Sequence, residues 1–350
     1  MATVAITGVG GLIGRRLARE LDQNEGVGRI VGLDVRAPGG LPARSLEFRQ
    51  ADVRDPDLAG HLADVDVLVH LAFQMDPIAD EATMRAVNVD GTRNVFRAAA
   101  DAGVRKVIYP SSVVAYGAHP DNDFPLTEES SIRANPDFSY SLHKGDVERW
   151  LRTWVDEHPE VMVTILRLGL VAGPGIDNAW TRLLLEQPRF TLIKGHRPPL
   201  QLAHVDDVLS AFAHAIDHDL PGAYNVACEG WLSTDEVVAI SDQRTVEIGE
   251  EVAYSALDRL WRMGAAQAPA GFVRYAMYPW VMSPDKLIRT GWRPKHTNRD
   301  ALADLVEDHR GHIVLGPARL ERSKVRLGLA ALTAAVGVLG VRSLLRRRRD

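Results

Sequence analysis

The sequence predicts an α/β protein with a doubly wound parallel sheet, because short apolar runs alternate with amphipathic helical patterns through its first half. The apolar runs are typical of buried strands and are Thr3–Thr7, Ile30–Asp34, Val65–Leu71, Val107–Pro110 and Met162–Leu166. Between them, apolar residues recur with helical spacing in Leu12–Leu21, Met84–Ala102 and Tyr140–Glu157. Strands joined by helices pair in parallel through right-handed crossovers, and such pairing produces a doubly wound parallel sheet.

The composition is that of an ordinary globular protein, with 46% hydrophobic and 25% charged residues among 350. The net charge of −5 is unevenly spread, because Pro317–Asp350 holds nine Lys/Arg and two acidic residues. The rest of the chain is therefore acidic, which argues against nucleic acid as a partner. A single cysteine, Cys228, and the absence of a secretion signal before Val4–Ile6 indicate the reducing cytoplasm.

The first predicted strand runs into a glycine-rich turn at the start of the first predicted helix. Glycines without a β-carbon let the backbone approach a pyrophosphate, whose charge is favoured by the amides at a helix N-terminus. Such spacing also occurs in plain tight turns, but its position between strand and helix favours a dinucleotide site. The residues of this predicted site are Gly8, Gly10, Gly11, Leu12, Ile13 and Gly14.

The second predicted strand ends at Asp34, about twenty residues after the glycines. A carboxylate there accepts hydrogen bonds from ribose hydroxyls and repels a 2′-phosphate, which favours NAD over NADP. Arg36, two residues on, is the group that could accept NADP instead. Asp52 and Val53 follow the next strand and either meet the adenine edge or lie in an exposed loop.

Tyr140 and Lys144 lie at i and i+4 of a predicted helix, which places a phenol and an ammonium on one face. A tyrosine ordinarily has a pKa of about 10, and Lys144 together with a cationic nicotinamide ring can lower that pKa toward about 7. Tyr140 is therefore a candidate general acid and base. Ser112 follows another predicted strand and is expected at the same rim of the sheet, where it could bond the substrate oxygen.

Taken in order, these elements resemble the extended short-chain dehydrogenase/reductase family, which includes NAD-dependent epimerases and dehydratases. The resemblance covers about residues 3 to 310 and also rests on His70-Leu71-Ala72, Asn88–Asn94, Gly173-Pro174-Gly175 and His204–Val208. It implies Ser112, Tyr140 and Lys144 as the catalytic set. The implied cofactor contacts are Gly8, Gly10, Gly11, Leu12, Ile13, Gly14, Asp34, Arg36, Asp52, Val53, Leu71, Ala72, Asn88, Tyr140 and Lys144.

The same resemblance implies roles for further polar residues. Asn88 supports the catalytic groups, while His204 and Asp207 belong to a hinge between two lobes. His70 and His143 are expected to pack or lie on the surface, and no histidine is expected to bind a metal.

Two departures from the family pattern narrow the range of candidate reactions. Dehydratases carry an Asp-Glu pair after the serine or threonine, whereas this chain has Val113-Val114, which disfavours dehydration. Nucleotide-sugar epimerases usually have an asparagine that contacts the diphosphate where Leu170 stands, although Arg197 could supply another polar contact.

We therefore expect an NAD(P)-dependent oxidoreductase or epimerase that acts on a secondary alcohol or ketone. The candidate substrates are an apolar alcohol and a sugar nucleotide. A nucleotide-sugar 4-epimerase and a non-catalytic dinucleotide sensor are the alternatives.

Three regions are expected along the chain. Residues 1–170 form a Rossmann domain, completed by about 200–228 with a late strand at Gly222–Ala227, and 171–199 with 229–312 form a smaller substrate-binding lobe. Residues 317–350 form a helical tail, in which Leu327–Val341 is uncharged and flanked by basic residues. As a helix this stretch would span about 22 Å, short of a bilayer core of roughly 30 Å. It is expected either to contact membrane lipid through residues 322–349 or to pack on the body or on the second subunit of a homodimer.

Overall fold

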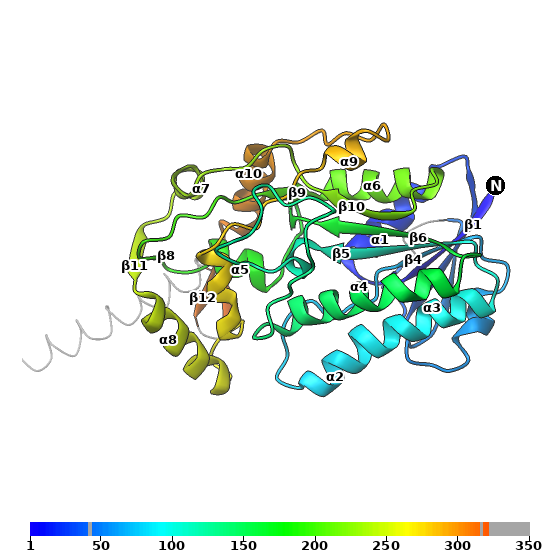
Figure 1. Cartoon of the computed structure of the whole chain (residues 1–350), viewed down its shortest axis with the longest axis horizontal. Helices are drawn as coiled ribbons and strands as arrows, with labels where there is room; N and C mark the ends of the chain where they lie inside the picture. The colour runs from blue at the N-terminus through cyan, green and yellow to red at the C-terminus, as the bar shows by residue number, and fades with distance from the viewer. Residues whose placement is uncertain (41–43, 316–317, 322–350) are drawn as a thin grey trace, which may run out of the picture.

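The computed structural model describes residues 1–40, 44–315 and 318–321. Its centre is a seven-stranded sheet in the order β10-β6-β5-β4-β1-β2-β3, and every neighbouring pair is parallel (Figure 1). The order reverses between β1 and β4, as in a doubly wound sheet, so the predicted fold class is confirmed. The strands are β1 (Ala2–Thr7), β2 (Val27–Asp34), β3 (Leu46–Gln50), β4 (Val67–His70), β5 (Lys106–Ser112), β6 (Met162–Leu168) and β10 (Gly222–Val226).

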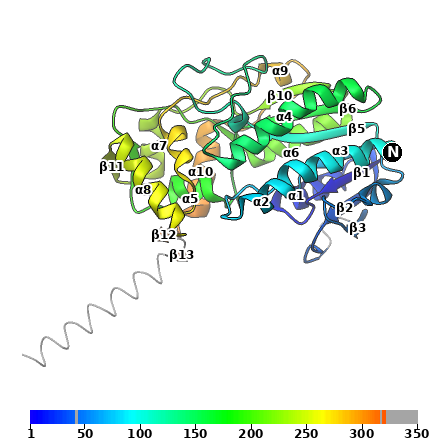
Figure 2. The same ribbon diagram turned by 60° about the horizontal axis from the view of Figure 1, so that its bottom comes forward.

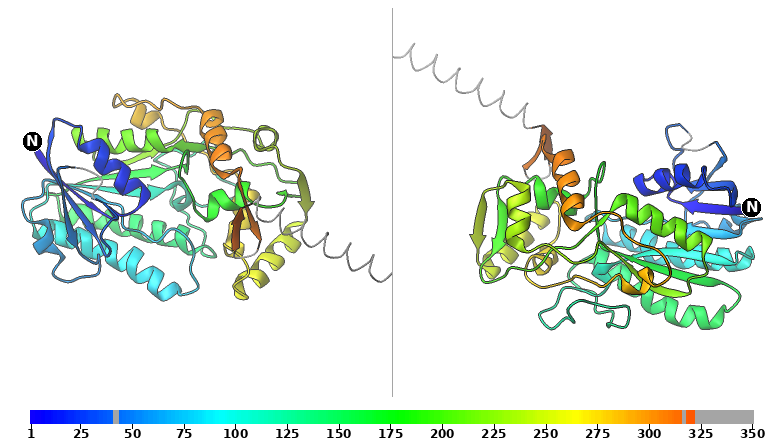
Figure 3. Two further views of the ribbon diagram at one scale, coloured as in Figure 1. Left: turned by 180° about the vertical axis from the view of Figure 1, so that it is seen from behind. Right: turned by 90° about the horizontal axis from the view of Figure 1, so that it is seen from above.

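Both faces of the sheet are covered by helices, because successive residues of each strand point to opposite faces. Val4 and Ile6 of β1 pack with α1 (Leu12–Leu21) and α6 (Val205–Asp217), and α1 is seen on this face from behind (Figure 3, left). Ala5, between them, packs with α3 (Thr92–Asp101) and α4 (Ser139–Glu157). A strand buried on both faces accounts for the continuous apolar runs in the sequence.

The predicted helix over Met84–Ala102 is wrong in its start and its regularity. The chain forms α2 (Glu81–Arg85), the π-helical turn η2 (Ala86–Gly91) and α3 in succession. The Asp80 carboxylate starts α2 by accepting a hydrogen bond from the Thr83 amide at 3.0 Å. In η2, Gly91 packs so closely on Val53 that a β-carbon would lie 2.7 Å from its Cγ2 atom.

The strands leading to the candidate site end later than predicted. β5 reaches Ser112 and β6 reaches Leu168, because their last residues continue to pair in parallel, with Ser112 opposite Leu168. This register places the Ser112 backbone within the sheet rather than in the following loop.

The remaining elements lie mainly beyond the carboxyl ends of the central strands, on the left in Figure 1. β8 pairs with β11, and β7 pairs with β9. These remaining elements are β7 (Leu170–Ala172), α5 (Ala179–Leu185), β8 (Phe190–Ile193), β9 (Leu202–His204), α7 (Thr234–Ser241), β11 (Thr245–Ile248), α8 (Glu250–Arg262), η4 (Ala270–Ala276), α9 (Asp285–Ile288) and α10 (Asn298–His309). Short 3-10 turns also occur at η1 (Leu58–Leu62) and η3 (Val113–Ala115).

The helical tail predicted from residue 317 is wrong for 318–321, which form strand β13 (Ala318–Glu321) antiparallel to β12 (His312–Leu315). Figure 2 shows this hairpin beside α5 and α10. The strand is held by Arg319, whose guanidinium bonds the carboxylates of Glu186 and Asp177, each at 2.6 Å. The predicted lipid-contacting segment 322–349 lies outside the described residues, and within them no helix has both the length and the apolar character needed to cross a bilayer.

Candidate active site

The glycine turn packs backbone against backbone at the carboxyl end of β1. Gly8 has a φ of +71°, and a β-carbon there would lie 2.8 Å from the Ala72 nitrogen. A β-carbon on Gly14 would lie 2.5 Å from the Gly8 carbonyl oxygen. Gly11 precedes α1 without any side-chain cap, so the amides of the first turn, at Leu12 and Ile13, face no capping side chain. The turn thus excludes side chains and offers amides, which fits a dinucleotide pyrophosphate.

Asp34 lies beside this turn, as the sequence predicted. Its Oδ2 atom accepts a hydrogen bond from the Gly10 amide at 3.0 Å, and Oδ1 accepts one from the Arg36 amide at 3.3 Å. Arg36 is exposed. The carboxylate is therefore placed at the rim where an adenosine ribose is bound in this kind of site.

Asp52 has a local partner that the sequence pattern did not reveal. Its carboxylate accepts from the Arg54 amide at 2.9 Å and from the Arg54 guanidinium at 2.6 Å, which lowers the pKa of Asp52. The neighbouring Val53 is buried, and its carbonyl accepts a hydrogen bond from Asn94 at 2.9 Å. These contacts hold the loop after β3.

The end of β4 is tied to the end of β1. Thr7 Oγ1 accepts a hydrogen bond from the Ala72 amide at 3.2 Å and contacts His70 Nδ1 at 2.7 Å. Burial lowers the pKa of His70 to about 3, so this histidine is neutral and packs in the core as expected. Leu71 and Ala72 therefore stand next to Gly8, where the resemblance places them.

Asn88 hydrogen-bonds the segment that follows β4. Its side chain accepts a hydrogen bond from the Gln74 amide at 2.7 Å and donates one to the Gln74 carbonyl at 2.9 Å. It also lies 3.3 Å from Nδ1 of His143, the residue before Lys144, and His143 is buried. Asn88 thus links η2 to α4 and to the loop beside the glycine turn.

Ser112, Tyr140 and Lys144 meet at the carboxyl end of β5. Ser112 lies close enough to the Tyr140 phenol to lower its pKa, and Ser112 Oγ accepts a hydrogen bond from the Val114 amide at 3.3 Å. Lys144 Nζ donates to the Pro110 carbonyl at 2.7 Å and lies 3.4 Å from the centre of the Phe73 ring. The three side chains that the sequence predicted as a set are therefore adjacent in space.

Without the nicotinamide ring, Lys144 does not offset the effect of burial on the Tyr140 pKa. Burial raises the pKa of Tyr140 to about 12, and only the Ser112 hydrogen bond opposes this. Burial also lowers the pKa of Lys144 well below its usual value, with Glu148 opposing. Lys144 Nζ is 5.9 Å from the Tyr140 ring centre because its bond goes to Pro110.

A buried ion pair behind this site was not predicted from the sequence. Glu148 and Arg167 are 2% and 4% exposed and pair at 2.7 Å. Ser111 donates to Glu148, and Arg167 also donates to the Tyr116 hydroxyl at 2.7 Å. The signals available were Glu148 four residues after Lys144 and a charged residue within an apolar strand.

His204 and Asp207 tie α6 to the segment before α10. Asp207 accepts from the amides of Lys295 at 2.8 Å and His296 at 3.0 Å, and the rings of His204 and His296 stack with centres 3.6 Å apart. The possible ligand atoms of His204, Asp207 and His296 lie within 4.8 Å of one another. The Asp207 bonds to backbone amides and the stacked rings give this group a structural explanation.

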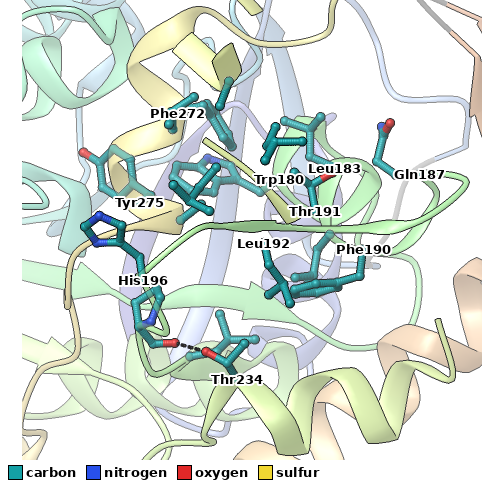
Figure 4. A pocket seen from close by; sticks show the side chains of 18 of the residues that line it. Trp180, Leu183, Gln187, Phe190, Thr191, Leu192, His196, Thr234, Phe272 and Tyr275 are labelled. Carbon is teal, nitrogen blue, oxygen red and sulfur yellow. Dashed lines mark hydrogen bonds between the residues drawn. The ribbon is translucent and has the colours of Figure 1, made fainter. Parts of the chain in front are cut away.

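Beside the catalytic cluster lies a cavity of about 420 Å³ (Figure 4). Trp180, Phe272 and Tyr275 line it and pack in one hydrophobic cluster with Tyr140. Leu170, at the epimerase asparagine position, also lines it. Arg197 does not line it, because its guanidinium is bound by the Glu247 carboxylate and by the Ile193 and His196 carbonyls. The cavity therefore has a leucine in place of the epimerase asparagine, and Arg197 does not replace the missing polar contact there.

A parallel sheet with a glycine turn, a carboxylate on the second strand and a Tyr-Lys pair at the same edge defines a dinucleotide-dependent oxidoreductase. Residues 4–227, more than half of the chain, match the model of the NAD dependent epimerase/dehydratase family. The protein belongs to this family of NAD-dependent enzymes, so the resemblance to extended short-chain dehydrogenases/reductases and the expectation of NAD are confirmed.

Individual proteins are similar to this chain in sequence or in fold. The uncharacterised protein Rv0501 of Mycobacterium tuberculosis is 28% identical over 338 residues, covering 93% of this chain and 89% of its own length. The crystal structure of gox2253 has a TM-score of 0.70 with 25% identity and covers 89% of this chain and 98% of its own. MoeE5 in complex with UDP-glucuronic acid and NAD has a TM-score of 0.68 with 23% identity, covering 88% of this chain and 99% of its own.

Proposed function

We propose that the protein catalyses reversible hydride transfer at a secondary alcohol or ketone, with Ser112, Tyr140 and Lys144 as its catalytic residues. The observation that carries this proposal is the meeting of these three side chains at the end of β5. In oxidation, the Tyr140 phenolate takes the hydroxyl proton of the alcohol, and Ser112 bonds the same oxygen. In this proposal Lys144 holds the nicotinamide ribose.

The glycine turn, Asp34 and the end of β4 hold NAD in this proposal. When bound, oxidised NAD supplies the hydride acceptor and a positive charge that lowers the pKa of a nearby phenol. The close approach of Gly8 to Ala72 supports this assignment because it keeps side chains out of the turn. The hydrogen bond from the Gly10 amide supports it because it holds the Asp34 carboxylate beside the turn.

Dehydration is disfavoured by the residues next to Ser112. Val113 and Val114 are both 2% exposed and belong to the hydrophobic cluster around Tyr140. Elimination of water needs an acid and a base in addition to the tyrosine, and two buried valines supply neither.

A nucleotide-sugar 4-epimerase is the second candidate, and the likeness in fold to MoeE5 with UDP-glucuronic acid supports it. Leu170 and Arg197 count against it: Leu170 is apolar, and Arg197 pairs with Glu247 and does not line the cavity, so neither offers a diphosphate a polar contact there. A non-catalytic sensor is disfavoured by the presence of both Tyr140 and Lys144 at one site.

The test is to incubate the protein with NAD and a panel of secondary alcohols and sugar nucleotides while following the absorbance of reduced cofactor. A dehydrogenase gives net reduction of NAD. An epimerase returns its hydride, so it converts a sugar nucleotide without net reduction. If no member of the panel reacts in either way, while the protein still binds NAD, hydride transfer is the wrong function.

The sequence supports three further proposals about the whole chain: a cytoplasmic enzyme, a homodimer, and contact of residues 322–349 with anionic lipid. The excess of Lys/Arg over acidic residues in Pro317–Asp350 supports the lipid contact. Co-sedimentation of the full chain with anionic vesicles, but not with neutral vesicles or at high salt, is expected. Equal sedimentation with both vesicle types contradicts the proposed lipid contact. Analytical ultracentrifugation tests the proposed homodimer.

A further inference from the structure

We propose that the substrate carries a large apolar group, a hydrocarbon chain or ring system, which occupies the cavity between α5, β8, α8 and η4. This inference rests on the proposed hydride transfer and assigns the part of the substrate that does not react. A volume of about 420 Å³ lies within the roughly 300–1,000 Å³ range of small-molecule sites.

A single aromatic layer separates the cavity from the catalytic tyrosine. The Phe138 ring centre is 5.9 Å from that of Tyr140 and 5.7 Å from that of Trp180, which lines the cavity. Leu170 lines the cavity and also packs in the cluster that contains Tyr140. The cavity therefore lies one aromatic ring away from Tyr140.

The lining itself is apolar. Among the described residues that line the cavity, none is Asp, Glu, Lys or Arg. Two of its polar side chains are already bonded: Thr234 donates to the Pro198 carbonyl at 2.8 Å, and His196 Nδ1 contacts the Met277 carbonyl at 3.2 Å. Figure 4 shows Thr234 and His196 at one end, with Leu183, Phe272 and Trp180 over the rest.

Basic residues near the cavity do not make up for this lack of charge. Arg182, Arg197 and Arg274 each adjoin lining residues in sequence, and each pairs with an acid, namely Asp177, Glu247 and Asp137. Arg189, Lys194 and Arg259 also adjoin lining residues but are exposed and do not line the cavity. A diphosphate in this cavity would lose its hydration without gaining a cation, which is strongly unfavourable.

The edge of the cavity is apolar as well. Leu260 of α8 lines the cavity and is 41% exposed, so it stands at the opening. Val252 on the same helix and Met263 directly after it are 61% and 63% exposed. Exposed apolar side chains beside an apolar cavity suit the entry of a water-insoluble ligand.

The test measures binding rather than turnover, using the change in tryptophan fluorescence, because Trp180 and Trp280 line the cavity. The probes are 2-alkanols of increasing length and UDP-glucose, added to the full-length protein with NAD. We expect Kd to fall about fourfold for each added methylene until the cavity is filled. UDP-glucose should neither bind tightly nor displace a long 2-alkanol. A Kd that is independent of chain length, or tight binding of UDP-glucose, overturns the proposal.

Two variants of α8 locate the site. Ala256→Trp places a ring in the lining at an exposed position, so it should weaken binding of the longest 2-alkanol at least about tenfold without affecting the fold. Val252→Trp adds the same ring to the same helix outside the lining and should leave Kd unchanged. Equal effects of the two variants overturn this location.

Tyr140→Phe should bind the alkanols normally. Alkanol binding without turnover by the natural protein would refute the proposed function alone, whereas turnover of a sugar nucleotide without alkanol binding would refute this inference alone.

Discussion

Arg167 and Glu148 form a buried ion pair directly behind the catalytic cluster, with Nη2 and Oε2 2.7 Å apart. Removal of one partner leaves the other charge buried, which typically costs about 3–5 kcal/mol. We therefore expect Arg167→Met to lower the free energy of unfolding by about that amount in urea titrations. The double variant Arg167→Met/Glu148→Gln should recover part of the loss.

The control for this prediction is an exposed pair. Arg310 pairs with Glu307 at 2.9 Å, but both side chains are about 70% exposed, so Arg310→Met should change stability by less than about 1 kcal/mol. If Arg167→Met is no more costly than Arg310→Met, the buried pair does not support this end of the sheet.

Gly14 is expected to be essential for binding NAD. An added β-carbon would lie 2.5 Å from the Gly8 carbonyl, so Gly14→Ala must push the turn out of shape. NAD affinity, measured by fluorescence titration, should fall roughly tenfold or more. At the exposed Gly60 a β-carbon meets nothing within 4 Å, so Gly60→Ala is the control. Unchanged NAD affinity in Gly14→Ala would remove the glycine turn from the cofactor site.

Asp34 is expected to set the preference for NAD over NADP. Asp34→Ala removes a carboxylate that accepts a hydrogen bond from Gly10 and repels a 2′-phosphate, so the ratio of NAD to NADP affinity should fall roughly tenfold or more. The Asp52 carboxylate pairs with Arg54, so Asp52→Ala should change this ratio much less. The opposite ranking of the two variants would contradict the assignment.

The pH dependence should follow the protonation state of Tyr140. Because burial raises the pKa of Tyr140 to about 12, the phenol is protonated at neutral pH in the free protein. Oxidation needs the phenolate, so kcat/KM for an alcohol should rise with pH, whereas kcat/KM for ketone reduction should fall at high pH. Alcohol oxidation that slows as the pH rises from about 7 to about 9 contradicts Tyr140 as the base.

Local patterns in the sequence predicted what local geometry decides. The predicted bounds of the first helix, Leu12–Leu21, are those of α1, because the glycine turn ends at Gly11. The positions of Tyr140 and Lys144 on one helical face likewise needed only their spacing. These features depend on residues that are close in the chain.

Features that depend on distant contacts could not be predicted. The π-helical turn η2 has the same apolar pattern as an α-helix, and its Gly91 packs on Val53, far away in sequence. The pairing of Glu148 with Arg167 and the cavity lining drawn from α5, β8 and α8 arise only when separate elements meet. The raised pKa of Tyr140 follows from burial, which its helical spacing does not reveal.

The most direct test of the central claim compares Tyr140→Phe with Tyr224→Phe, using an alcohol that the natural protein oxidises with NAD. Tyr224 lies on β10 with Lys286 over its ring, away from Ser112 and Lys144, so its variant should keep normal turnover. Tyr140→Phe should bind NAD normally but lose at least about 100-fold in kcat, because the proton acceptor is gone. Full turnover by Tyr140→Phe would contradict the proposed mechanism.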